Sequence, residues 1–126
     1  MKRLIAAIII FVIAASGAVT SNIYVSKHID LLLADTQTLI DAAETEDKET
    51  ATNGVKKLEE SWDESQTFLH MFVIHREMND IELNVYALAE YLEEGEWALF
   101  REMTVRIQQT LKHIEHSQQL TLSNVF

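Results

Sequence analysis

The residues of this 126-residue chain that could do chemistry are five histidines and the carboxylates near them. His113 and His116 lie three residues apart, so on one helix both imidazoles face the same side and can bind one metal ion. His75 precedes two carboxylates, Asp80 and Glu82, that can serve as further ligands. If the helices carrying these residues are antiparallel neighbours, all five side chains are candidates for a metal site in a helical bundle.

The sequence motifs of known metal-binding bundles are absent from the chain, since it has neither paired Glu-x-x-His segments nor a His-Glu-x-x-His segment. The alternative is that His75, Asp80 and Glu82 form a hydrogen-bonded polar cluster at a helix junction. In that alternative, His113 and His116 lie in the last turn of a helix, where the helix dipole favours them. We therefore assign no cofactor.

Catalysis finds little support in the sequence. The carboxylate runs, such as Glu59-Glu60 and Glu93-Glu94, have polar neighbours and predict a solvated face, whereas an acid–base pair needs an apolar pocket. The chain has no Gly-x-Ser-x-Gly segment, no glycine-rich phosphate loop and no cysteine. We expect no catalytic residue and no enzymatic activity.

The composition bounds the fold and the partners. A net charge of −10 argues against binding to nucleic acid, which requires a basic surface. The chain has no proline and three glycines, so it lacks the residues that build the many turns of a sheet protein. The sequence therefore predicts an all-α protein.

The N-terminal segment is the most hydrophobic part of the chain. After Lys2 and Arg3, an apolar run extends from Leu4 to Val25, which is long enough to cross the hydrocarbon core as a helix. The alternative is a cleaved signal peptide, for which Ser16–Ala18 offers small residues. Apolar residues continue at helical spacing to Ala43, which favours a retained anchor that runs into the first helix of the domain.

This interpretation divides the chain into an anchor, residues 1–26, and a helical domain, residues 27–126. Because Lys2 and Arg3 precede the span, we expect the N-terminus in the cytoplasm and the domain outside it, at the cell membrane.

The domain should contain three to four helices in an antiparallel bundle. The first covers residues 27–43, and the acidic stretch 42–54 that follows it contains the turn-forming pair Asn53-Gly54. Asp47 is also a good N-cap, so residues 47–52 are alternatively the first turns of the second helix. Gly95 predicts the end of a later helix, and the last helix follows it.

Residues 70–94 carry the most regular apolar pattern of the chain. Its members alternate in steps of three and four: Met71, Ile74, Met78, Ile81, Val85, Leu88 and Leu92. This seam serves the protein's own core or a partner helix, including a second copy of the chain. Asn79 and Glu82 resemble a capping box, which favours a break near residues 76–80 over one helix spanning residues 55–93.

Several short segments resemble a family of small bacterial proteins known as domain of unknown function 4363. They are Leu-Glu-Glu-x-Trp at 58–62, His-Arg-Glu-Met-Asn-Asp-Ile-Glu at 75–82, Leu-Lys-His-Ile at 111–114 and the ending Leu-Thr-Leu-Ser-Asn-Val-Phe at 120–126. The resemblance covers nearly the whole chain. It implies a membrane-associated helical protein without an assigned activity, beside a polytopic membrane protein.

These observations lead to one expected function and one alternative. We expect a membrane-anchored helical accessory protein that interacts with a polytopic membrane protein or with a second copy of itself. The alternative is a ligand- or metal-sensing bundle that uses His75, Asp80, Glu82 and His113.

Overall fold

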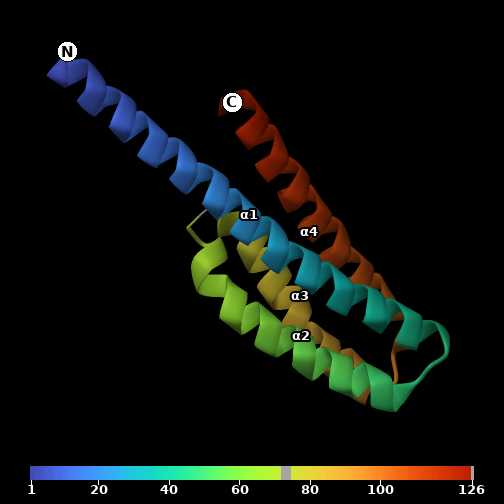
Figure 1. The fold of residues 1–126 in the computed structure, drawn as a ribbon. Helices are drawn as coiled ribbons and strands as arrows, with labels where there is room; N and C mark the ends of the chain where they lie inside the picture. The colour runs from blue at the N-terminus through green and yellow to red at the C-terminus, as the bar shows by residue number, and fades with distance from the viewer. Residues whose placement is uncertain (72–74, 126) are drawn as a thin grey trace.

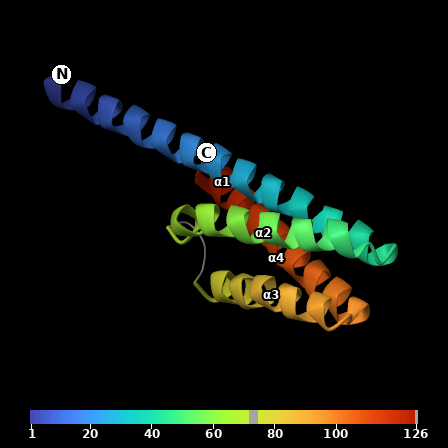
Figure 2. The ribbon, with the colours of Figure 1, turned by 90° about the horizontal axis from the view of Figure 1, so that it is seen from below.

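The fold is a bundle of four helices, seen in a computed structural model that describes residues 1–71 and 75–125, without the side chains of residues 21, 22 and 118–125. The helices are α1 (Lys2–Glu44), α2 (Lys48–Leu69), α3 (His75–Glu93) and α4 (Trp97–Val125). In the described residues each helix packs on the one before it, and α4 closes back on α1 (Figures 1 and 2). The predicted all-α antiparallel bundle is confirmed.

Helix α1 is one uninterrupted rod with two different environments along its length. Its first part, residues 2–20, projects from the bundle, and we call it the stalk (Figure 1). The large apolar side chains of the stalk are exposed, whereas Val25 and Ile29 are fully buried. The expected continuity between the apolar segment and the first helix of the domain is therefore confirmed. Among the described residues, α1 is the one helix long and apolar enough to cross a membrane.

The core of the bundle consists of one buried stripe from each helix. Helix α3 contributes Met78, Ile81, Val85, Leu88 and Leu92. These five residues of the predicted interaction seam therefore pack inside the chain and are not available to a partner in this fold. Met71 is 70% exposed just beyond α2, and Ile74 lies outside the described residues.

The predicted turn at Asn53-Gly54 is wrong, because both residues lie inside α2. The alternative start is confirmed: Asp47 caps α2 and accepts a hydrogen bond from the Thr50 backbone N–H at 3.2 Å. Gly54 has a packing role. A Cβ atom at this position would lie 2.6 Å from Cδ2 of Leu39, so the missing side chain allows α1 and α2 to pack closely.

Two helices cover residues 48–93, but the break precedes the predicted one. Helix α2 ends at Leu69 and α3 begins at His75, so Asn79 and Glu82 are interior to α3 and do not form a helix start. The buried part of α1 runs from Val25 to Ala43. At about 1.5 Å per residue, a helix that packs along this part of α1 needs about 20 residues before the chain turns back. Helix α2 has 22 residues and ends at Leu69, which fits this length.

The α1–α2 and α3–α4 turns share one hydrogen-bond pattern. In the second turn the Gly95 N–H donates to the carbonyl of Leu92 and the Glu96 N–H to that of Tyr91. In the first turn, Glu46 and Asp47 donate to Ala43 and Ala42 in the same way. Both are Schellman motifs, and the predicted helix end at Gly95 is confirmed.

Helix α4 is longer than the sequence indicated. Its backbone stays helical through Val125, so His113 and His116 lie within the helix and not in its last turn. The C-terminal part of α4 extends beside α1 toward the stalk (Figures 1 and 2).

Candidate functional site

The stalk-proximal end of the bundle gathers all five histidines. We use this name for the end from which the stalk projects, and it contains the start of the bundle part of α1, the end of α2, the start of α3 and the part of α4 from His113 onward. Because neighbouring helices are antiparallel, residues far apart in sequence meet there. The histidines are His28, His70, His75, His113 and His116. Sequence reasoning expected His75, His113 and His116 at one end of the bundle but missed His28 and His70, because their place depends on the alignment of α1 with α2.

Two of these histidines lie beside one another at the α2–α3 connection. The rings of His70 and His75 are 5.5 Å apart between centroids. His70 also lies 3.5 Å from the side-chain nitrogen of Gln66, which in turn donates to Glu82 at 3.2 Å. Glu82 is therefore part of the α2–α3 contact.

The other predicted metal ligands lie on the α3–α4 side. His113 Nε2 is 3.2 Å from Glu77 Oε1, an ion pair when the imidazole is protonated. Asp80 and His113 line one shallow hollow together with Glu77. His116 lies nearly one helical turn beyond His113 toward the C-terminus of α4 and is exposed.

The predicted metal set is thus divided between two faces of α3. Glu82 faces α2, whereas Asp80 faces α4. Among the described residues, no group of three His, Asp or Glu side chains is close enough to hold a metal ion. His113 pairs instead with Glu77, which was not in the predicted set. The relative alignment of α3 and α4 determines this pairing.

An aromatic cluster marks the point where α1 enters the bundle. The rings of Tyr24 and Phe68 meet edge to face with centroids 4.4 Å apart, and the His28 ring lies 4.5 Å from that of Tyr24. His28 Nδ1 is 3.1 Å from the hydroxyl of Ser65, which is buried. These contacts fasten the first bundle turn of α1 to the last turns of α2.

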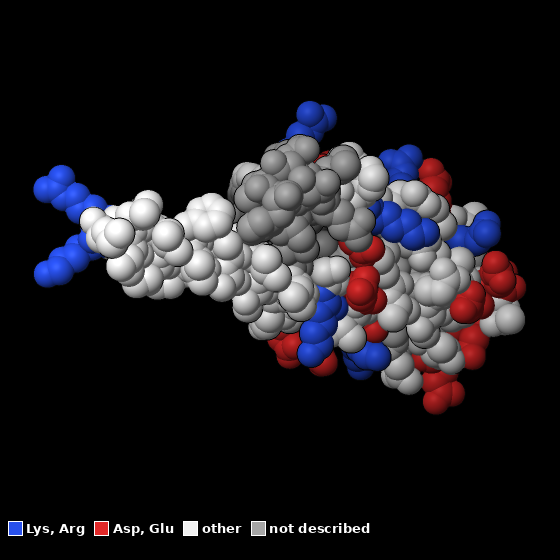
Figure 3. Space-filling view, turned by 45° about the horizontal axis from the view of Figure 1, so that its top comes forward, with Lys and Arg blue, Asp and Glu red and all other residues white. Residues whose placement is uncertain are grey.

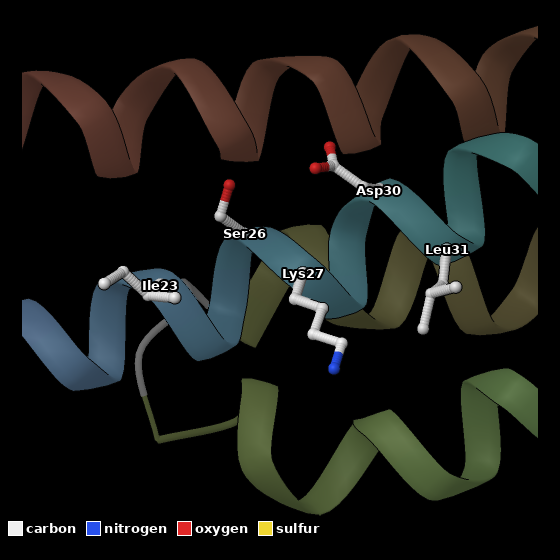
Figure 4. A pocket seen from close by; sticks show the side chains of 5 residues that line it. All are labelled: Ile23, Ser26, Lys27, Asp30 and Leu31. Carbon is white, nitrogen blue, oxygen red and sulfur yellow. The ribbon is translucent and has the colours of Figure 1, made fainter.

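Two carboxyl groups meet between α1 and α4 at the same end. Asp30 points from α1 toward α4 (Figure 4). A hydrogen bond with Asp30, together with partial burial and the negative charge of Asp30, raises the pKa of Glu115 above its ordinary value. No donor among the described residues reaches the buried Oε2 of Glu115. This arrangement favours the protonated form of Glu115.

The face of α1 next to this pair carries both apolar and charged side chains. A shallow hollow beside Asp30 is lined by Ile23, Ser26, Lys27 and Leu31 (Figure 4). Ile23 and Leu31 are exposed and extend the apolar surface of the stalk onto the bundle.

Charge is distributed unevenly along the molecule. The stalk is charged only at its tip, where Lys2 and Arg3 lie, and Figure 3 shows that the other charged side chains in view, acidic and basic, lie on the bundle. The turns at the stalk-distal end carry two acidic runs, Glu44–Asp47 and Glu93–Glu96. The bundle therefore has an acidic stalk-distal end and a stalk-proximal end that carries the five histidines.

The carboxylate run of α2 takes part in contacts with α3. Tyr86 donates its hydroxyl to Asp63 at 3.0 Å, and this hydrogen bond raises the pKa of Tyr86. Burial and the nearby charge of Asp63 raise the pKa of Glu59. These groups lie on an outer helix surface, and Tyr86 is exposed.

Comparisons with known proteins give one match. A family model described as Domain of unknown function (DUF4363) matches residues 19–125. No protein with a curated description and no solved structure matches the chain. The matched region begins in the last turn of the stalk and covers the whole bundle.

Proposed function

Since the chain belongs to the family called Domain of unknown function (DUF4363), we propose a function from its own geometry: a membrane-anchored accessory module that acts by interaction with a membrane protein. The stalk would cross the membrane with Lys2 and Arg3 in the cytoplasm, and the bundle would lie outside the cytoplasm. The proposal includes no catalytic step. The sequence supports this, because it has neither a Gly-x-Ser-x-Gly nucleophile motif nor a glycine-rich phosphate loop.

The observation that carries the proposal is the change of environment along α1. Eight large apolar residues between Leu4 and Ile13 are each more than half exposed. Burial of one such side chain is worth about 1.5–3 kcal/mol, so a segment of this kind is strongly favoured in lipid over water. From Val25 onward, the same helix packs into the bundle and buries its apolar face there.

The type of partner follows from the lack of a linker. Because α1 is continuous, the bundle cannot move far from the membrane that holds the stalk. Helix α2 has 22 residues and is about 33 Å long at about 1.5 Å per residue. A partner would have to present its surface within about that distance of the lipid, which favours a membrane protein over a freely diffusing one.

The anchor is tested by the mass and the membrane retention of the mature chain. We expect a chain that still contains the stalk and resists extraction from membranes at alkaline pH. A Val12→Arg and Ile13→Arg double variant should shift the protein to the soluble fraction, because each charge near the centre of a span costs about 2.5–3.5 kcal/mol. A mature chain that begins after residue 18 would contradict the anchor.

The interaction is tested with photo-cross-linking residues on the bundle surface. Suitable positions are Leu83 and Leu31, both exposed and apolar, with exposed Lys56 as a polar control. We expect cross-links to one integral membrane protein from a subset of positions after isolation in mild detergent. A monomer without cross-links from any of the positions would contradict the accessory role.

The sensing alternative receives no support from a specific contact. Its four residues are divided between the α2 side and the α4 side of α3, as described above. We therefore do not propose it as a second function.

A further inference from the structure

We propose that the stalk-proximal end of the bundle rests on the lipid bilayer, with Met71 and Tyr24 inserted at the membrane interface. This inference rests on the proposed membrane anchoring of the stalk and adds a second membrane contact to it. The partner at this surface is the lipid itself and not another protein.

The register between α1 and α2 gives the height of Met71. Tyr24 contacts Phe68, and His28 contacts Ser65, so α2 runs antiparallel to α1 with these pairs at equal height. Met71 comes three residues after Phe68, about one helical turn closer to the stalk. It is therefore level with the last turn of the apolar segment of α1.

The length of the apolar segment places the membrane boundary at the same level. About 20 residues of helix cross the roughly 30 Å hydrocarbon core, at about 1.5 Å each. Counted from Leu4, the first residue after Lys2 and Arg3, this length ends at Ile23. The next charged residue is Lys27, one turn further on. The boundary at Ile23 therefore falls between the level of Tyr24 and that of Met71, which are about one helical turn apart.

The side chains at this level suit a lipid interface. Met71 is 70% exposed, Ile23 is 62% exposed and Tyr24 is 47% exposed, although the surface of a small domain usually keeps such groups apart. Tyrosine is enriched at the boundary between hydrocarbon and headgroups, because its ring is apolar and its hydroxyl is polar.

Polar side chains follow the exposed apolar residues Met71, Ile23 and Tyr24 in the direction of the bundle. His28 and Lys27 come in the next turn of α1, and His70 and His75 flank the α2–α3 connection. Lipid headgroups offer these side chains water and phosphate oxygens. From Met71 toward the bundle the side chains are first apolar and then polar, which matches the change of polarity across a membrane interface.

The rigidity of α1 makes the contact obligatory when the stalk spans the bilayer. A flexible linker would allow the bundle to lift from the surface, but α1 has no break between the stalk and the core. The helix thus fixes the height of Met71 relative to the membrane.

The experiment uses the full chain in vesicles of phosphatidylcholine and phosphatidylglycerol. The chain has no cysteine, so single substitutions place a polarity-sensitive fluorophore at one site each. Met71→Cys is the test position. Leu83→Cys is the matched control, since Leu83 is also 70% exposed but lies on α3 about two turns from the connection. Ile10→Cys, at 67% exposure in the stalk, reports on the anchor.

We expect lipids that carry a nitroxide near the headgroup to quench the label at position 71 and to leave the label at position 83 unquenched. Ile10 should be quenched by nitroxides deep in the acyl chains. Quenching at position 10 with none at position 71 would overturn the inference and leave the anchor intact. No quenching at position 10 would overturn the proposed anchoring itself.

A second substitution separates lipid contact from contact between copies. A blue-shifted label at position 71 that lipid nitroxides do not quench would mean that another copy covers Met71, and would overturn the inference. With the label moved to His75→Cys, a Met71→Asp change should lower headgroup quenching, whereas Leu83→Asp should not. Because both changed residues are exposed, far-UV circular dichroism should show unchanged helix content for both.

Discussion

Glu46 and Gly95 occupy the same position in the two stalk-distal turns, each with a positive φ angle, 50° for Glu46 and 73° for Gly95. Each residue follows a helix and donates its N–H to a carbonyl three residues earlier. The left-handed conformation costs a residue with a Cβ atom about 1–2 kcal/mol and costs glycine nearly nothing. The first turn therefore carries a strain that the second turn avoids.

We predict that Glu46→Gly raises the free energy of unfolding by about 0.5–1 kcal/mol, and that Gly95→Ala lowers it by about 1 kcal/mol. Thermal unfolding in detergent, followed by circular dichroism, should show shifts of roughly 4–8 °C per kcal/mol. Gly17→Ala is the control, because Gly17 lies inside α1 without a positive φ angle and a Cβ atom there has no neighbour within 4 Å, so this change should not lower the midpoint. A lower midpoint for Glu46→Gly would mean that the glutamate side chain stabilises the turn.

At Gly54 we expect a Gly→Ala change to lower stability, whereas the same change inside a helix usually raises it. Gly→Ala inside a helix normally stabilises by about 1 kcal/mol. Here the new Cβ atom would lie 2.6 Å from Cδ2 of Leu39, which is fully buried and has little room to move. We expect Gly54→Ala to destabilise the bundle by about 1–3 kcal/mol, as overpacking does.

Leu39→Val provides the matched background for Gly54→Ala, since it removes the Cδ2 atom that would lie too close to the new Cβ atom. In a double-mutant cycle measured by thermal unfolding, Gly54→Ala should cost less in the Leu39→Val background than in the wild-type chain. Equal effects in both backgrounds would contradict the close contact between α1 and α2.

The carboxyl pair Asp30–Glu115 should make stability depend on pH. Because the raised pKa of Glu115 means that the folded protein binds this proton more tightly than the unfolded chain, the free energy of unfolding falls as pH rises above the ordinary value of 4.5. Glu115→Gln keeps a neutral side chain at all pH values. We expect it to raise the midpoint by about 2–4 °C at pH 8 and to have little effect near pH 4.5.

The control for Glu115→Gln is Glu64→Gln, which makes the same change at an exposed glutamate of α2. Its effect should not follow the same pH profile. A stabilisation by Glu115→Gln that is equal at both ends of the pH range would show that the raised pKa of Glu115 does not contribute to stability.

Asp35 and Lys57 form an ion pair with one buried member. Asp35 is 7% exposed and its Oδ1 lies 3.4 Å from Nζ of Lys57, whose side chain is mostly in solvent. Lys57→Ala leaves the Asp35 carboxylate without this counter-charge, and we expect a loss of about 0.5–1 kcal/mol because solvent screens the lysine. Lys56→Ala, at an exposed neighbour, should have a smaller effect on the thermal midpoint.

An Asp35→Asn change tests the cause of this loss. If the missing counter-charge is responsible, Lys57→Ala should cost less in the Asp35→Asn background than in the wild-type chain. A loss of the same size in both backgrounds would assign it to the aliphatic part of Lys57.

The apolar periodicity predicted much of the fold. The stripe of Met78, Ile81 and Val85 lies in the core, and the first helix continues from the apolar segment, as the spacing indicated. The errors concern helix ends. Asn53-Gly54 has the composition of a turn, but the cost of glycine in a helix is small beside the packing that its missing side chain permits.

The candidate site could not be read in the same way. The sequence paired His75 with Asp80 and Glu82 because they are near one another along the chain. On α3, Asp80 and Glu82 face different neighbours, and His113 meets Glu77 instead. Such pairs depend on the relative alignment of two helices, and no local pattern encodes that alignment.

The sequence by itself determined the helical class, the apolar stalk and the buried stripe of α3. These properties follow from local spacing and from the solvation of individual side chains. Only the tertiary structure decided which ends of the helices meet: it brought five histidines, the Asp30–Glu115 pair and exposed Met71 to the end from which the stalk projects. The physical reason is that the register between antiparallel helices is set by close packing between residues distant in sequence. One example is the side chain of Leu39, which packs against Gly54.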